Sequence, residues 1–133
     1  MATIELEIPP RSVYVGVVRL AVASLARAAG LDEETVDDLK IAVSEACANA
    51  VLGLEKIDAD DPITITFSES DSGLELEVAD RAPVPDVAAD PEDSQGFDSR
   101  STMSLALLQS LVDDCRITPR SGGGTVTRLS VAR

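Results

Sequence analysis

The sequence contains no histidine and no tryptophan, and aromatic residues make up only 2% of its 133 positions. The lack of histidine excludes phosphotransfer through a phosphohistidine, hydrolysis by a Ser-His-Asp triad and metal binding through imidazole ligands. The scarcity of aromatic rings argues against single-stranded nucleic acid as a ligand, because that binding relies on stacking between bases and aromatic side chains. The hydrophobic core must be built from leucine, valine, isoleucine and alanine.

Cysteine and long apolar runs are also scarce. Cys47 and Cys115 are the two cysteines, which suits a reducing compartment and does not indicate a disulfide. No apolar run approaches the roughly 18 residues of a membrane span, and no basic leader precedes an apolar segment. We therefore expect no membrane association and a cytoplasmic location.

Basic residues are few, since 11 Lys and Arg against 24 Asp and Glu give a net charge of −13. Between Asp58 and Asp98, thirteen acidic side chains accompany a single basic one, Arg81. Such a region repels nucleic-acid phosphates, so no direct binding to nucleic acid is expected. It would attract a basic protein surface, although acidity also serves solubility alone.

Hydrophobic periodicity predicts five strands and three helices. The strands are expected at Thr3–Ile8, Ile63–Phe67, Leu74–Ala79, Cys115–Thr118 and Val126–Val131, and the helices at about 14–28, 32–54 and 101–112. Their order predicts an α/β (α+β) two-layer sandwich, in which a mixed, mostly antiparallel sheet carries the helices on one face.

The first two helices carry boundary signals. Gly30 is a suitable stop after the first helix, and Asp32 is a suitable N-cap for the second. The second helix is apolar on two sides, which is typical of a helix packed between other elements. The apolar residues whose helical spacing indicates the first helix are Tyr14, Val17, Val18, Ala21, Leu25 and Ala28.

Glu45 and Asn49 lie four positions apart on the second helix, so they point the same way. A carboxylate there can act as a general base toward a hydroxyl group. An amide oxygen one turn later can ligate Mg²⁺, which prefers oxygen ligands and phosphates. This spacing alone is common on solvated helices, so the surrounding sequence has to support it.

The surrounding sequence does support a nucleotide site. Glu45–Asn49 resembles the N box of GHKL-type (histidine-kinase-like) ATP-binding proteins, and Tyr14–Leu20 and Asp38–Val51 resemble the amino-terminal half of RsbW-type anti-sigma factors, which are also serine protein kinases. Further matches are Leu74–Asp80, Leu107–Ile117 and Gly124–Val126. The resemblance covers almost the whole chain and implies one such domain over residues 1–133.

The resemblance implies roles for individual side chains. Glu45 would be the catalytic base, and Asn49 would bind the Mg²⁺ of Mg-ATP. Asp80 would accept a hydrogen bond from the exocyclic amine of adenine, assisted by Thr125. Arg19 matches a family arginine that contacts the sigma factor and its competing antagonist, a protein with the STAS fold.

The two glycine boxes that cradle ATP in the family are degenerate here. After Asp80, Ala82 and Val84 occupy the glycine positions, and Pro83 lies between them. Glycine allows close backbone approach to a nucleotide, whereas proline removes an N–H donor. The following segment, about 81–100, lacks periodicity and is expected to be a lid.

The second box lies where the lid meets the third helix, and it reads Ser101-Thr102-Met103-Ser104-Leu105 in place of a glycine-rich pattern. Family proteins hold phosphates at this helix N-terminus. Serine and threonine still cap helices and donate hydrogen bonds. The candidate phosphate ligands here are Arg100, Ser101, Thr102 and Ser104.

Two interpretations stay open. In the first, the chain sequesters an alternative, stress- or development-type sigma factor and uses ATP to phosphorylate a serine of a STAS-domain anti-anti-sigma protein. In the second, it is a catalytically inactive pseudokinase that acts only as a binding module in partner switching. The resemblance also implies a homodimer, formed through Thr3–Ile8 and the first helix. A third, remoter alternative is such a homodimer acting as a scaffold without sigma specificity.

Overall fold

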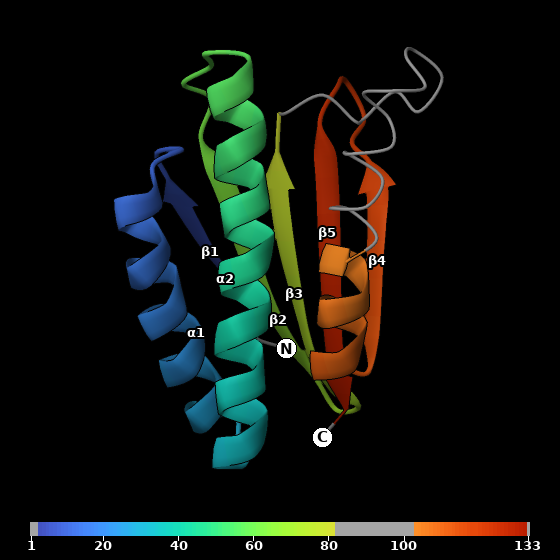
Figure 1. The fold of residues 1–133 in the computed structure, drawn as a ribbon. Helices are drawn as coiled ribbons and strands as arrows, with labels where there is room; N and C mark the ends of the chain where they lie inside the picture. The colour runs from blue at the N-terminus through green and yellow to red at the C-terminus, as the bar shows by residue number, and fades with distance from the viewer. Residues whose placement is uncertain (1–2, 82–102, 133) are drawn as a thin grey trace.

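The computed structural model describes residues 3–81 and 103–132, which form one sheet and three helices (Figure 1). Their chain order is β1 (Thr3–Ile8), the short 3-10 turn η1 (Ser12–Tyr14), α1 (Val15–Ala28), α2 (Glu33–Lys56), β2 (Ile63–Ser70), β3 (Gly73–Asp80), a helix over residues 103–111, β4 (Asp114–Pro119) and β5 (Thr125–Ala132). The predicted elements are all present, and the strands other than β1 are longer than expected.

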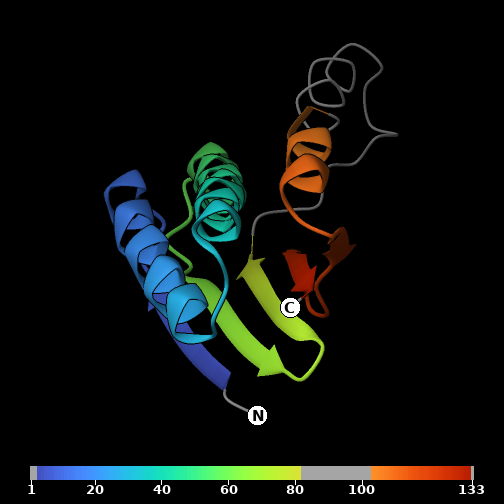
Figure 2. The ribbon, with the colours of Figure 1, turned by 90° about the horizontal axis from the view of Figure 1, so that it is seen from below.

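The strand order across the sheet is β1-β2-β3-β5-β4, and the four pairings between these described strands are antiparallel. The sheet was expected to be mixed and mostly antiparallel. The helices all lie on one face (Figure 2), which confirms the two-layer α+β sandwich. Alternation sends apolar side chains toward the helices most clearly on β2, where Ile63, Ile65 and Phe67 are buried.

The connection between α1 and α2 has the predicted boundary residues. The N–H of Leu31 donates to the carbonyl of Ala26 (3.1 Å), and Gly30, at φ +87°, donates to Arg27 (3.0 Å), which is the hydrogen-bond pattern of a Schellman motif. Asp32 then caps α2 by accepting from the N–H of Thr35 at 2.8 Å. This hydrogen bond lowers the pKa of the Asp32 carboxyl, because it stabilises the ionised form.

Helix α2 lies on the sheet between α1 and the helix over 103–111 (Figure 2), as a helix apolar on two sides should. Cys47 lies on its buried face, and burial raises the pKa of that thiol to about 12. Within residues 3–81 and 103–132, no helix is both long enough and apolar enough to cross a membrane. The buried residues of α2 are Val36, Leu39, Ala42, Val43, Ala46, Cys47, Ala50, Val51 and Leu54.

The apolar spacing that predicted α1 coincides with its buried side at Val18, Ala21 and Leu25 but not at the other three positions. Tyr14 and Val17 are 38% and 49% exposed, and Ala28 is exposed. Leu20, at 72% exposed, also faces outward. The helix is apolar nearly all round, so periodicity alone could not identify the face that meets the sheet. The buried residues are Val15, Val18, Val22, Ala23 and Ala26.

Candidate nucleotide site

The two polar candidates on α2 lie in its carboxyl-terminal half, toward the end of the molecule where β3 also ends (Figure 1). Glu45 is half-buried and Asn49 is exposed. Because they lie four positions apart, their side chains leave the helix on one side. The helix therefore presents a carboxylate and an amide side by side.

Asp80 is the last residue of β3, and its burial is unusual for a carboxylate, since the residue is only 5% exposed. In the antiparallel register between β3 and β5 it lies directly opposite Thr125, which is half-buried. The structure thus brings together the two residues that the resemblance associates with adenine. A buried carboxyl group beside a hydroxyl group can recognise an amine donor.

The turn before β5 packs closely on Asp80. Gly124 has φ +112°, and a Cβ added there would overlap the backbone carbonyl oxygen of Asp80. A residue with a side chain would have to move either this turn or the end of β3. Glycine at this position therefore fixes where the Asp80 end of the strand lies.

Two arginines connect the same strand end and turn. Arg81 donates to the carbonyl of Gly123 at 3.1 Å, and Arg120 donates to the carbonyl of Asp80 at 3.4 Å. Each guanidinium therefore bonds the backbone of the opposite segment. Sequence reasoning missed this pair, although Arg81 stood out as the single basic residue in the acidic stretch.

Ser104 contacts Asn49. The amide nitrogen of Asn49 donates to the hydroxyl of Ser104 at 2.6 Å, and Ser104 is only 7% exposed. This hydrogen bond joins α2 to the helix over 103–111. The other three candidate phosphate ligands, Arg100, Ser101 and Thr102, lie outside the described residues, as does the expected lid apart from Arg81.

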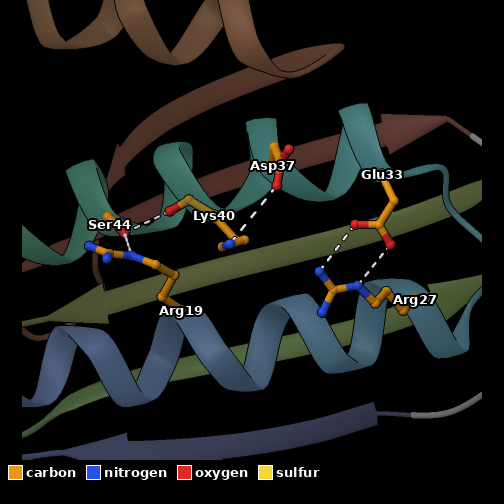
Figure 3. Close-up of polar contacts among 6 residues, drawn as sticks. All are labelled: Arg19, Arg27, Glu33, Asp37, Lys40 and Ser44. Atoms are coloured by element: carbon orange, nitrogen blue, oxygen red, sulfur yellow. Dashed lines mark hydrogen bonds and ion pairs between the residues drawn. The ribbon is translucent and has the colours of Figure 1, made fainter.

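Arg19, the predicted partner contact, lies on the exposed side of α1 and is held by α2 (Figure 3). Its Nε donates to the hydroxyl of Ser44 at 2.8 Å, and that hydroxyl donates to the backbone carbonyl of Lys40 at 2.6 Å. Ser44 directly precedes Glu45. The arginine is therefore attached to the helix that carries the candidate catalytic base.

A second arginine on α1 forms an ion pair with α2 (Figure 3). Arg27 donates to both carboxylate oxygens of Glu33, at 2.9 and 3.1 Å. This contact raises the pKa of Arg27 and lowers that of Glu33. Both side chains are well exposed, so the pair adds little to stability.

The donor groups fit a magnesium nucleotide. Among the described residues there is no group of three or more His, Cys, Asp or Glu side chains that could hold a metal ion. A nucleotide-bound Mg²⁺ needs only one or two protein oxygens, because phosphates and water supply the rest. Asn49 would supply such an oxygen, and Asp80 with Thr125 would supply acceptors for a base.

The fold and the site together define a histidine kinase-like ATPase domain. The helices lie on one face of an antiparallel sheet, the central helix carries a carboxylate and an amide, and a buried aspartate ends a strand. The family description "Histidine kinase-like ATPase domain" matches residues 8–131. "Serine-protein kinase RsbW" of Bacillus subtilis is 33% identical over 127 residues, covering 90% of this chain and 79% of that protein. The protein of the same name from Bacillus pumilus is 35% identical over 129 residues, covering 90% and 80%. The chain belongs to the RsbW family of histidine kinase-like ATPase domains.

A solved structure supports the fold. The crystal structure of the RsbU and RsbW domains of a Mycobacterium tuberculosis protein superimposes with a TM-score of 0.74 at 20% sequence identity. The match covers 100% of this chain, which spans 33% of that protein. At this identity the similarity shows that the two share a fold.

Proposed function

We propose that this protein is a cytoplasmic anti-sigma factor with serine protein kinase activity. It sequesters an alternative sigma factor, is opposed by a STAS-domain protein, and phosphorylates a serine of that protein with ATP. The observation that carries the proposal is the placement of Glu45 and Asn49 in the half of α2 that lies toward the end of β3, where Asp80 is opposite Thr125, in a chain of the RsbW family.

Each polar residue of this site has a distinct task in the proposed reaction. Asp80 accepts from the adenine amine, and the amide oxygen of Asn49 faces the nucleotide-bound Mg²⁺, which offsets charge on the phosphates. Glu45 accepts the proton of the serine hydroxyl as the serine oxygen bonds to the γ-phosphorus and the bond to the ADP oxygen breaks.

The partner surface is proposed on the outward side of α1. Arg19 is exposed on this helix, as are the apolar residues Val17 and Leu20, and arginine together with apolar residues is typical of protein interfaces. The net charge of −13 favours a basic partner. We also propose a homodimer formed through β1 and α1.

One observation favours the alternative of a pseudokinase. Ala82 and Val84 occupy positions where the family has glycine, and Pro83 lies between them. If these changes abolish nucleotide binding, the fold acts through protein contacts alone. Sigma-factor binding is common to both proposals.

Calorimetric titration with Mg-ATP tests the nucleotide proposal. We expect micromolar binding, and we expect Asp80→Asn to weaken it by about tenfold or more, because a hydrogen bond to a charged group contributes ~1.5–3 kcal/mol. Glu77→Gln is the matched control, since Glu77 lies on the same strand and bonds Arg128. Lack of binding at millimolar nucleotide would establish the pseudokinase alternative.

Co-purification from the source cells tests the partner proposal. The tagged full chain is expected to retain a sigma factor at low salt and to release it as salt rises, because screening weakens charge attraction. Arg19→Ala should reduce retention at least about tenfold, as truncation of interface arginines often does. Arg27→Ala on the same helix is the control. Retention of no sigma factor at any salt concentration contradicts the proposal.

A further inference from the structure

The contact between Asn49 and Ser104 connects two segments that are 55 positions apart in the chain. Its donor is the amide nitrogen of Asn49 and its acceptor is the hydroxyl oxygen of Ser104, 2.6 Å away. Ser104 is buried, whereas Asn49 is exposed. The serine side chain is therefore fixed inside the protein, and the amide extends from it toward solvent.

The orientation of the Asn49 amide decides whether it can bind a cation. An asparagine side chain has a donor nitrogen at one end and an acceptor oxygen at the other. When the amide nitrogen of Asn49 is bonded to Ser104, the amide oxygen of Asn49 can bind a ligand. In the reverse orientation the oxygen would accept the proton of Ser104, and the NH₂ group would face the cation and repel it.

Serine at position 104 can control this orientation in a way that glycine cannot. The resemblance places a glycine-rich pattern over residues 101–105, and a glycine has no side chain with which to hold the amide. The hydroxyl of Ser104, which the sequence predicted as a phosphate ligand, accepts the hydrogen bond from Asn49, a contact that the sequence did not predict.

We propose that Ser104 is a positioning residue, which holds the amide nitrogen of Asn49 so that the amide oxygen faces the Mg²⁺ of a bound nucleotide. The inference rests on the proposed nucleotide binding and assigns a new part of it. Ser104 acts on the metal through Asn49, as groups around metal ligands commonly do. Although the second glycine box has lost its glycines, its residue Ser104 thus still contributes to Mg²⁺ binding by orienting Asn49.

Titration of the full chain with ATP, in the presence of Mg²⁺ or of EDTA, tests this role. Ser104→Ala should weaken Mg-ATP binding about five- to tenfold, because one oriented hydrogen bond is lost, and should leave the affinity for metal-free ATP unchanged. In an Asn49→Ala background the same change should have no further effect. Ser110→Ala is the matched control, since that hydroxyl bonds the carbonyl of Leu107 within the same helix.

The possible outcomes separate this inference from the proposed function. If Ser104→Ala weakened ATP binding equally with and without Mg²⁺, the serine would have a structural role and the inference would be overturned. Tighter Mg-ATP binding by Ser104→Ala would overturn it too, since the hydroxyl would then be competing for the oxygen. A wild-type chain that does not bind Mg-ATP at all contradicts the proposed function itself, and the role of Ser104 with it.

A second measurement needs no nucleotide. In the nucleotide-free protein, one of the two side-chain amide protons of Asn49 should exchange with water more slowly than in Ser104→Ala, as measured by NMR. Equal exchange in the two proteins would show that the nitrogen is not held, and would overturn the inference.

Discussion

Gly124→Ala is expected to be among the most destabilising single substitutions in this chain, lowering the free energy of unfolding by about 4 kcal/mol or more. Two effects combine at this position. A residue with a side chain is strained at φ +112°, which costs ~1–3 kcal/mol. Its Cβ would also overlap the carbonyl oxygen of Asp80, so the turn or the end of β3 must shift.

Gly123→Ala separates these two effects. Gly123 has φ +102°, and a Cβ added there meets no atom within 4 Å. It therefore carries the backbone strain without the overlap and should cost only ~1–3 kcal/mol. Urea denaturation of both variants measures the difference. Equal losses of stability would mean that Asp80 is not in close contact with the turn.

Glu45→Gln is expected to slow phosphorylation of a STAS-domain substrate by ~10²- to 10⁴-fold, the usual contribution of a general base. Glutamine keeps the size of the side chain but cannot accept the serine proton. Because that proton moves only in the transition state, the affinity for Mg-ATP should change little. Single-turnover phosphorylation assays measure the rate of the chemical step. Calorimetry measures the affinity for Mg-ATP.

Glu55→Gln, an exposed carboxylate near the end of the same helix, is the control. An unchanged rate in Glu45→Gln would place the base elsewhere in the protein. A fall in Mg-ATP affinity as large as the fall in rate would instead assign Glu45 a binding role. Either result would leave the RsbW fold assignment intact while changing the proposed mechanism.

Local chemistry made much of the fold predictable from sequence. Gly30 and Asp32 were identified correctly because helix ends need a left-handed residue and an acceptor for free N–H groups, and both requirements act over a few neighbouring positions. Alternation likewise identified the first three strands, and the two later strands that the sequence predicted are present as well. The buried face of α1 was not predictable, because that helix offers apolar residues in several directions and only packing selects among them.

The contacts that organise the candidate site depend on residues far apart in the chain. The bonds from Arg120 to Asp80, from Asn49 to Ser104 and from Arg19 to Ser44 span 40, 55 and 25 positions. No periodicity relates such residues, so a sequence pattern can nominate Asp80 or Asn49 but cannot identify the group that holds it. Ser104 illustrates this, since the sequence indicated it as a phosphate ligand but gave no sign of its contact with Asn49.

The order of strands in the sheet has a consequence for biosynthesis. β1, β2 and β3 are neighbours in the sheet, and all three, together with α1 and α2, precede residue 81. The strand that pairs with Asp80 begins only at Thr125. Because translation proceeds from the amino terminus at about 5–20 residues per second, α1 and Arg19 leave the ribosome before the partner strand of Asp80. A nascent chain therefore carries its proposed sigma-binding helix before its nucleotide site can be completed.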